Sequence, residues 1–139
     1  MIFREAVESD YPSIMALHKS ENWGLDTLSA LKNFHKLNTI VVCEENNLIV
    51  GKMDLMQKSK ADRSFLYIER LIVHPEYRHK GVAKKFITYA ENECKKRNLD
   101  AVELAVREDN DAAVHLYTSS GFQILGKKVY MQKSISKEQ

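Results

Sequence analysis

The feature that most limits the fold of this chain is an apolar run over residues 65–73. In an extended strand the side chains alternate between two faces, here Phe65, Tyr67, Leu71 and Val73 on the first, and Leu66, Ile68 and Ile72 on the second. Apolar residues on both faces are typical of a strand in the middle of a sheet. Glu69 and Arg70 interrupt the run, so they are candidates for a function or for ion pairing.

A strand–helix–strand unit is predicted to begin with this strand. After a short basic loop, apolar residues recur at helical spacing over residues 82–94. Residues 101–106 again have a strand pattern, with Glu103 on the face opposite Val102 and Leu104. Such a connection makes the two strands parallel and the crossover right-handed.

The rest of the chain predicts further strands and helices around this unit. Strands are expected at residues 2–6, 39–44, 48–56, 122–125 and 129–135, and helices near residues 12–18, 28–34 and 113–117. Ser9 or Asp10, and Asp26 or Thr27, are expected to cap the first two helices. Asn46-Asn47 predicts a hairpin turn, and residues 58–63 a polar loop. We expect one α/β domain over residues 1–139, with a mixed sheet of six to seven strands and about four helices.

Composition and charge exclude several classes of protein. The chain has 139 residues and a formal net charge of +2, which gives no basic surface of the kind that nucleic acid requires. No segment approaches the roughly 18 apolar residues of a membrane span, and the N-terminus lacks a signal-peptide pattern, so a cytoplasmic location is expected. Cys43 and Cys94 lack the spacing of metal ligands, so we expect them in the core and expect no metal site.

Positive charge is concentrated in the loop between the central strand and the following helix. Arg78, Lys80, Lys84 and Lys85 surround Gly81, which precedes the predicted start of the helix. The first N–H groups of a helix have no intrahelical partner, and together with the helix dipole they favour a phosphate. Glycine lets an anion approach the backbone because it has no Cβ. A solvated basic loop is the alternative interpretation.

Two motifs in this order resemble the GNAT superfamily of N-acetyltransferases. The first is Arg78-x-x-Gly81-x-Ala83, similar to the family's loop for the coenzyme A pyrophosphate, although the family more often has glycine at the position of Ala83. The second is Asn110-x-x-Ala113-x-x-x-Tyr117-x-x-x-Gly121-Phe122, similar to a later family signature. Residues 71–75 resemble the strand that pairs with pantetheine. The resemblance is dense from about Phe65 to Phe122.

This resemblance implies an acetyl-CoA-dependent transfer to a primary amine, with direct attack in a ternary complex. The coenzyme would contact Leu71, Ile72, Val73, Arg78, His79, Lys80, Gly81, Val82, Ala83, Lys84, Asn110 and Tyr117. By the same resemblance, the backbone N–H of Val73 or its neighbour would hold the oxyanion, left free where two strands splay apart. The alternative function is a non-catalytic acyl-CoA-binding regulatory module.

Tyr117 is the candidate general acid. A phenol with a pKa of about 10 can protonate a departing thiolate, whose pKa is about 8.5. The structural alternative is an amphipathic tyrosine packed at helical spacing. Asn110 has two possible roles, to cap the fourth helix and, by resemblance, to bind the pantetheine arm.

Glu69 is the first candidate for the general base, directly or through water. The alternative for Glu69 is an ion pair with a residue such as Arg70 or Lys52. Glu103 is the second candidate, and a solvated strand face is its alternative role. One branch of the family often has a glutamate where this chain has Ala105, so the base is open. His74 and His115 are expected to be bystanders.

The acceptor is the least specified part of the prediction. It is a primary amine, on a small molecule or on a protein. By resemblance it would lie near the first two helices and the last strands, where Trp23 and Tyr130 are candidate wall residues. No nucleic-acid or membrane partner is expected, and the protein would be a monomer or a homodimer.

Overall fold

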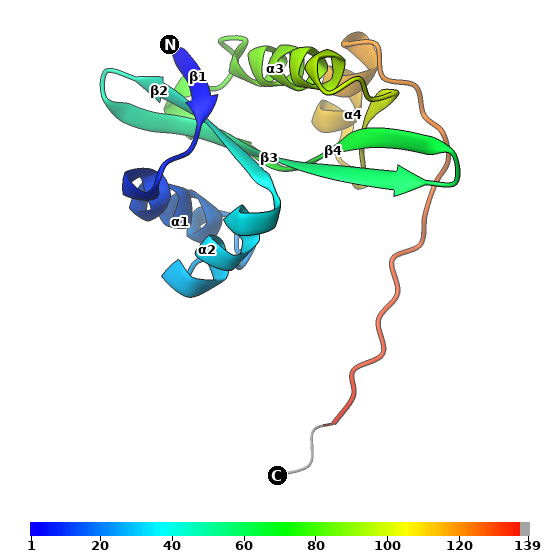
Figure 1. The fold of residues 1–139 in the computed structure, drawn as a ribbon, viewed down its shortest axis with the longest axis horizontal. Helices are drawn as coiled ribbons and strands as arrows, with labels where there is room; N and C mark the ends of the chain where they lie inside the picture. Colours follow the sequence, from blue (N-terminus) through cyan, green and yellow to red (C-terminus); the bar gives the residue numbers. More distant parts are fainter. Residues whose placement is uncertain (137–139) are drawn as a thin grey trace. The chain divides into compact units, whose positions relative to one another are not determined.

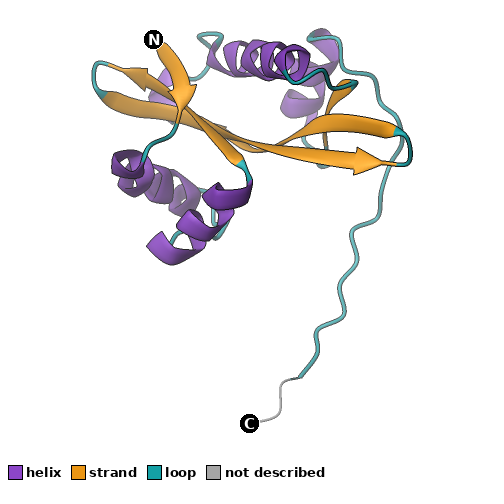
Figure 2. Ribbon diagram, in the orientation of Figure 1, coloured by secondary structure: helices purple, strands orange, loops and turns teal. Residues whose placement is uncertain are grey.

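The computed structural model describes residues 1–136, which form two compact units, residues 1–105 and the residues from Val106 on. The first unit contains a five-stranded sheet in the order β1-β2-β3-β4-β5. Its strands are drawn in orange in Figure 2. Its strands are β1 (Ile2–Glu5), β2 (Thr39–Glu45), β3 (Leu48–Lys60), β4 (Arg63–Val73) and β5 (Ala101–Leu104). The first four are antiparallel, and β5 is parallel to β4. The parallel pair confirms the predicted strand–helix–strand unit.

Helices cover both faces of this sheet (Figure 1). The helices α1 (Tyr11–Ser20) and α2 (Leu28–Leu37) lie on one face, and α3 (Val82–Lys96) on the other. On the first face the Tyr11 hydroxyl pairs with His35 Nδ1, beside a buried cluster of Ala6, Tyr11, Ile14, Leu31, Ile40 and Val42. On the second face the Phe86 ring meets the Phe3 ring edge-on, with centroids 4.9 Å apart.

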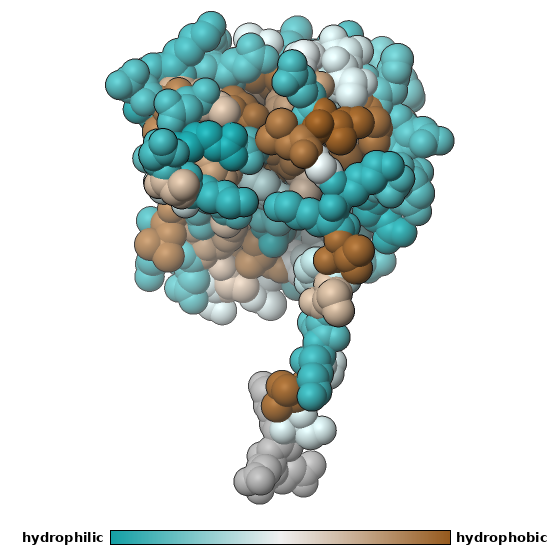
Figure 3. Space-filling model, turned by 90° about the vertical axis from the view of Figure 1, so that its right-hand side faces the viewer, coloured by the Kyte–Doolittle hydropathy of each residue, from teal (hydrophilic) through white to brown (hydrophobic). Residues whose placement is uncertain are grey.

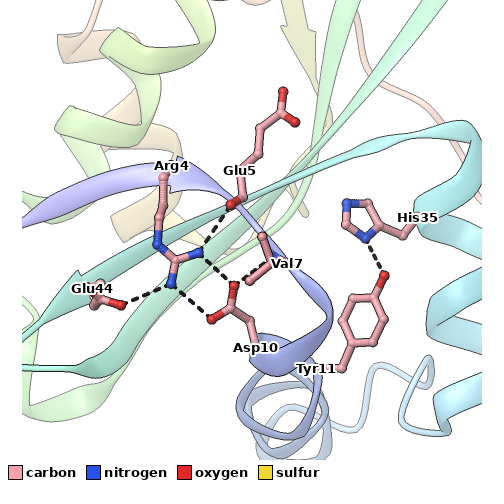
Figure 4. Close-up of polar contacts among 7 residues, drawn as sticks. All are labelled: Arg4, Glu5, Val7, Asp10, Tyr11, His35 and Glu44. Carbon is pink, nitrogen blue, oxygen red and sulfur yellow. Dashed lines mark hydrogen bonds and ion pairs between the residues drawn. The ribbon is translucent and has the colours of Figure 1, made fainter.

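An arginine ties the beginning of the chain to the sheet (Figure 4). Arg4 donates to both carboxylate oxygens of Asp10, at 2.7 and 3.0 Å, and to Glu44 at 3.0 Å. Asp10 also accepts the Val7 N–H at 2.8 Å, so its side chain joins the short helix η1 (Glu8–Asp10) to β1 and does not cap α1. The Arg4 guanidinium lowers the pKa of the Asp10 carboxyl. At α2 the predicted cap is confirmed, because Thr27 accepts the Ala30 N–H.

The structure confirms the predicted turn of the first hairpin but not the loop that was predicted for the second. Asn46 and Asn47 both have left-handed backbone, with φ of 51° and 64°, which confirms the predicted β2–β3 turn. The predicted polar loop over residues 58–63 is wrong, because β3 continues to Lys60 and β4 begins at Arg63. The β3–β4 ladder continues beyond the apolar core, as far as the pair Lys60 and Arg63. In this part of the hairpin, Lys58 lies over the Tyr67 ring, 4.1 Å from its centroid.

A β-bulge at Arg70 changes which side chains share a face of β4. Asp54 is opposite Glu69, whereas Lys52 is opposite Ile72, so β4 has one extra residue between the two pairs. Arg70 carries the left-handed backbone of the bulge, with φ of 49°. Ile72 therefore lies on the face of Glu69, and the predicted simple alternation is wrong beyond Arg70.

The second unit contains one helix and a long extended segment. The helix is α4 (Asp111–Ser119), and the described residues after Phe122 form no strand. The predicted six to seven strands are thus wrong, because the strands expected at residues 122–125 and 129–135 find no ladder partner among the described residues. The exposed apolar side chains of this extended segment are Ile124, Leu125, Val129, Tyr130, Met131 and Ile135. Figure 3 shows brown, hydrophobic spheres among teal ones on the segment that extends from the molecule. Alternation favours extended backbone, but a strand also needs a neighbour for its N–H and C=O groups.

Candidate active site

The site in the first unit begins where β4 extends beyond β5. The β4–β5 ladder ends with the pair Ile68 and Leu104, and β4 continues to Val73. The next N–H, that of His74, donates to Val50 O on β3 at 2.8 Å. Because backbone groups in an antiparallel strand alternate in direction, the Val73 N–H is turned away from β3, toward the edge that β5 has left.

Gly81 forms the beginning of α3 with a backbone that suits glycine. Its φ is 81°, in the left-handed region, and no heavy atom lies within 4 Å of where a Cβ would stand. As the N-cap residue it offers no side chain to the first N–H groups of the helix. These groups are therefore available to an anion approaching past Gly81.

The basic side chains of the loop differ in what they contact. Arg78 Nε donates to Val73 O at 2.9 Å, and its Nη2 lies 3.6 Å from Glu21, so this arginine fixes the loop to the end of β4. Lys80 is exposed, and its Nζ lies 5.3 Å from the ring centroid of Tyr77. Tyr77 is the last residue of the short helix η2 (Pro75–Tyr77). Lys84 is also exposed on the first turn of α3.

The remaining predicted coenzyme contacts in this unit fall into two groups. The side chains of Ile72 and Val82 are buried, so only their backbone groups can meet a ligand. The others are half-buried or exposed: Leu71, Val73, His79, Gly81 and Ala83. His74, expected to be a bystander, accepts the Glu76 N–H through Nδ1 and so caps η2.

Glu69 belongs to a charged cluster of Lys52, Asp54, Arg70 and Glu69. Lys52 Nζ donates to Asp54 Oδ1 at 2.6 Å, and Arg70 Nη1 lies 3.4 Å from Asp54 Oδ2 and 3.1 Å from Glu69 Oε2. The side chains of Lys52 and Asp54 are 0% exposed, whereas that of Glu69 is 42% exposed. The ion pair anticipated as the alternative for Glu69 is thus present, with Arg70.

The sequence did not single out Asp54. Lys52 and Asp54 are two residues apart, so they share a strand face, and two charged residues on one face usually mark the solvent side. Here that face lies against α1 and α2, because Asp54 is opposite Ile40 and Lys52 opposite Val42 in the buried cluster. The usable signal was that both neighbouring strands carry a charged pair, at residues 52 and 54 and at residues 69 and 70.

His18 adds a neutral group beside this cluster. Its Nδ1 lies 3.0 Å from Leu25 O, so Nδ1 carries the proton and Nε2 is an acceptor. Nε2 is buried and has no hydrogen-bond partner within residues 1–136. Burial, with a smaller effect of Lys52, lowers the pKa of His18. Trp23, a candidate wall residue, is half-buried, with its ring centroid 6.1 Å from that of His18.

The buried ammonium makes stability depend on pH in a defined direction. Burial lowers the pKa of Lys52 to about 8, although Asp54 favours the charged form. An unfolded lysine has a pKa of about 10.4, so between about pH 8 and pH 10.4 the unfolded chain binds more protons and the free energy of unfolding rises with pH. In the double variant K52M/D54L, apolar side chains replace both charged groups. We expect urea unfolding to show that the free energy of unfolding rises with pH in the natural protein relative to this variant. A difference that stays constant across this window would contradict the prediction.

Glu103, the second candidate base, is engaged in an ion pair. It is opposite Tyr67 in the β4–β5 ladder and lies 2.7 Å from Arg63 Nη2. Tyr67 and Glu69 are two residues apart, so the two candidate carboxylates share a face of the sheet. Glu69 is the more exposed of the two, with 42% against 20% of its side chain accessible.

In the second unit, Asn110 directly precedes α4 and Tyr117 lies within it. Asn110 accepts the Ala113 N–H at 3.1 Å, which confirms the predicted cap. At the other end Gly121, with φ of 96°, donates to Thr118 O, and the Phe122 N–H donates to Tyr117 O at 3.0 Å. This is a Schellman ending, with its usual apolar contact here made by the Tyr117 and Phe122 rings. The Asn…Tyr…Gly-Phe spacing therefore also defines a complete helix.

Tyr117 keeps its proton at neutral pH. Burial raises the pKa of its phenol above the usual value of about 10. A protonated phenol is the form that a general acid requires. His115 is exposed on α4, and Tyr130, the other candidate wall residue, is 94% exposed.

Residues 1–136 contain neither a cluster of metal ligands nor a membrane-spanning helix. This part of the chain has no group of three or more His, Cys, Asp or Glu residues that could hold a metal ion. None of its helices is both long and apolar enough to cross a bilayer. Cys43 and Cys94 are free and buried, and burial raises the pKa of both thiols.

Comparison with known proteins decides the family. The profile of the Acetyltransferase (GNAT) family matches residues 3–122 of the chain. This protein belongs to the GNAT family. The match begins within β1 and includes β2 to β5, the Arg78–Ala83 loop and the whole of α4, so it covers both motifs.

Relatives and solved structures agree with this membership. An acetyltransferase of Pectobacterium atrosepticum is 32% identical over 100 residues, 68% of each chain. The structure of AAC(6')-Iy in complex with a coenzyme A bisubstrate analogue superposes with a TM-score of 0.83 at 14% identity, over 96% of this chain and 98% of that one. A transcriptional regulator of Bacillus halodurans gives a TM-score of 0.82 at 19% identity, over 95% and 99%. At these identities both structures show the mixed α+β GNAT fold.

Proposed function

We propose that this GNAT protein transfers the acetyl group of acetyl-CoA to a primary amine. The observation that carries the proposal is the continuity of two features in residues 73–84. The Val73 N–H faces the edge that β5 has left, and the loop leads directly to the uncapped, Gly81-led beginning of α3. One feature suits a thioester carbonyl and the other a diphosphate.

The residues of the loop fit the diphosphate of the coenzyme. The first N–H groups of α3 donate to its oxygens, and Lys80 and Lys84 supply positive charge from exposed positions. Arg78 holds the loop against Val73 O, which keeps these donors in place. AAC(6')-Iy, which has this fold, forms a complex with a coenzyme A bisubstrate analogue, and this supports coenzyme A as the ligand.

In the proposed reaction, each candidate residue has a separate role in moving a proton, stabilising charge or binding the coenzyme. Glu69 takes the proton of the acceptor ammonium, directly or through water, and the neutral amine attacks the thioester carbonyl carbon. As the C–N bond forms, the Val73 N–H donates to the developing oxyanion. When the C–S bond breaks, the Tyr117 phenol donates its proton to the thiolate. The second proton of the attacking nitrogen, which leaves as the neutral amide forms, passes through water to the Tyr117 phenolate, and Glu69 releases its proton to solvent. Asn110 binds the pantetheine arm.

The acceptor class is also part of the proposal, and two structural neighbours support it. The aminoglycoside acetyltransferases with this fold favour a small-molecule amine, and a protein amine is the other possibility. The Bacillus halodurans regulator favours the second candidate function, a non-catalytic acyl-CoA-binding module. Turnover separates the two functions, because only the enzyme releases free thiol.

The test combines coenzyme binding with turnover. We expect acetyl-CoA at 100 times its Kd to stabilise the protein by about 2.7 kcal/mol in thermal unfolding. With a panel of primary amines, including aminoglycosides and peptides, we expect thiol release that depends on the amine. Gly81→Ala weakens coenzyme binding, because alanine strains the left-handed backbone and adds a Cβ where the diphosphate approaches.

A matched glycine variant controls for general damage. Gly126 also has open surroundings but lacks left-handed backbone, so Gly126→Ala should bind acetyl-CoA as the natural protein does. Binding without amine-dependent thiol release would favour the regulatory module. Absence of stabilisation at millimolar acetyl-CoA would refute both candidate functions.

A further inference from the structure

We infer that Lys52, Asp54 and Arg70 are positioning residues that hold the carboxylate of Glu69 for catalysis. This inference rests on the proposed function, in which Glu69 is the base. Its first support is an unbroken series of contacts. Lys52 reaches Asp54 Oδ1 at 2.6 Å, Asp54 Oδ2 reaches Arg70 at 3.4 Å, and the same Arg70 nitrogen reaches Glu69 at 3.1 Å.

Burial decreases along this series toward Glu69. The side chains of Lys52 and Asp54 are 0% exposed, that of Arg70 is 24% exposed and that of Glu69 is 42% exposed. The buried end is fixed by the surrounding core, and the open end is accessible to a substrate. The Arg70 guanidinium also lies over the ring of Phe34 on α2, 5.4 Å from the ring centroid, in a cation–π contact.

The backbone of β4 is shaped to bring these groups together. Without the bulge, neighbouring residues such as Glu69 and Arg70 would point to opposite faces of the sheet. With its left-handed backbone, Arg70 instead reaches both Glu69 and Asp54, which lies opposite Glu69 on β3. The bulge at Arg70 also lies only two residues after Ile68, the last β4 residue that pairs with β5. Bulges that re-aim side chains are frequent beside active sites.

Stability alone does not explain the buried pair. The desolvation of a buried lysine and aspartate offsets most of their attraction, and apolar replacements of similar volume are often neutral or stabilising. Lys52 and Asp54 do not touch the open edge of β4 themselves. Their described contact in that direction is Arg70, which therefore transmits their position to Glu69.

The experiment measures kcat and KM for acetyl-CoA in variants of the residues that form this series of contacts. Glu69→Gln tests the base itself. We expect Arg70→Gln and K52M/D54L to lower kcat by about 10- to 100-fold without changing KM for acetyl-CoA, because a misplaced base slows the chemistry and not the binding of the coenzyme. Arg70→Lys should recover part of the loss, since it keeps the charge. In a Glu69→Gln background, Arg70→Gln should lower kcat no further.

A matched arginine controls for the loss of a half-buried ion pair. Arg97 is 25% exposed and pairs with Glu93 at 3.1 Å, so Arg97→Gln should leave kcat unchanged. If Glu69→Gln retains full kcat, the proposed base is wrong and the inference falls with it. If Glu69→Gln lowers kcat but Arg70→Gln does not, or if their effects multiply, only the inference is overturned. Should K52M/D54L fail to fold, the Arg70 variants decide.

Discussion

Replacing Tyr117 with phenylalanine lowers kcat for acetyl transfer by about 10²- to 10⁴-fold, the range for losing a general acid. The variant loses only the phenolic hydroxyl, because the phenyl ring keeps its contact with Phe122 and the helix keeps its Schellman ending. Affinity for the coenzyme should change little, since the proton moves only when the C–S bond breaks. Steady-state kinetics with acetyl-CoA and the best amine of the panel measure both quantities.

A second half-buried tyrosine provides the control for this substitution. Burial raises the pKa of Tyr89 on α3, as it does that of Tyr117. Tyr89→Phe should therefore leave kcat unchanged if the effect at Tyr117 is catalytic. Turnover of Tyr117→Phe equal to that of the natural protein would remove Tyr117 from the mechanism and leave the packing of α4 as its role.

Local patterns in the sequence were sufficient to predict the central part of the fold. The apolar run at residues 65–73, the helical spacing after Gly81 and the strand at residues 101–106 predict the parallel β4–β5 pair, and Asn46-Asn47 predicts a hairpin. Each of these depends on neighbours in the chain or on a connection with few geometric solutions. The last strands depend on a distant partner, and alternation in residues 122–135 carries no information about one.

The charged cluster shows the same limit at the candidate site. The interruption at Glu69 and Arg70 is visible in the sequence, and it correctly marked the ion pair that Glu69 makes. The bulge is not visible, because one extra residue in a ladder depends on the register with β3. The burial of Asp54 is not visible in the sequence either, because strand alternation alone does not show which face of the sheet α1 and α2 cover.

The largest expected effect on stability follows from separating Lys52 and Asp54. Asp54→Asn leaves the Lys52 ammonium buried without its carboxylate partner, and removing one member of a buried pair typically costs about 3–5 kcal/mol. A domain of this kind has a total stability of about 5–15 kcal/mol, so the loss should be evident as a large shift of the urea midpoint. K52M/D54L removes both charges and should stay close to the natural protein.

The contrast between these variants separates two reasons for keeping a buried ion pair. Glu8→Gln, which breaks the exposed pair with Lys32 at 2.9 Å, should leave the urea midpoint unchanged and so shows that burial, not pairing, sets the cost. If K52M/D54L is as unstable as Asp54→Asn, the pair is needed to hold the core of the sheet. If K52M/D54L is stable yet has lost kcat, the fold does not need these charges and the reaction does, because Arg70 no longer holds Glu69 in place.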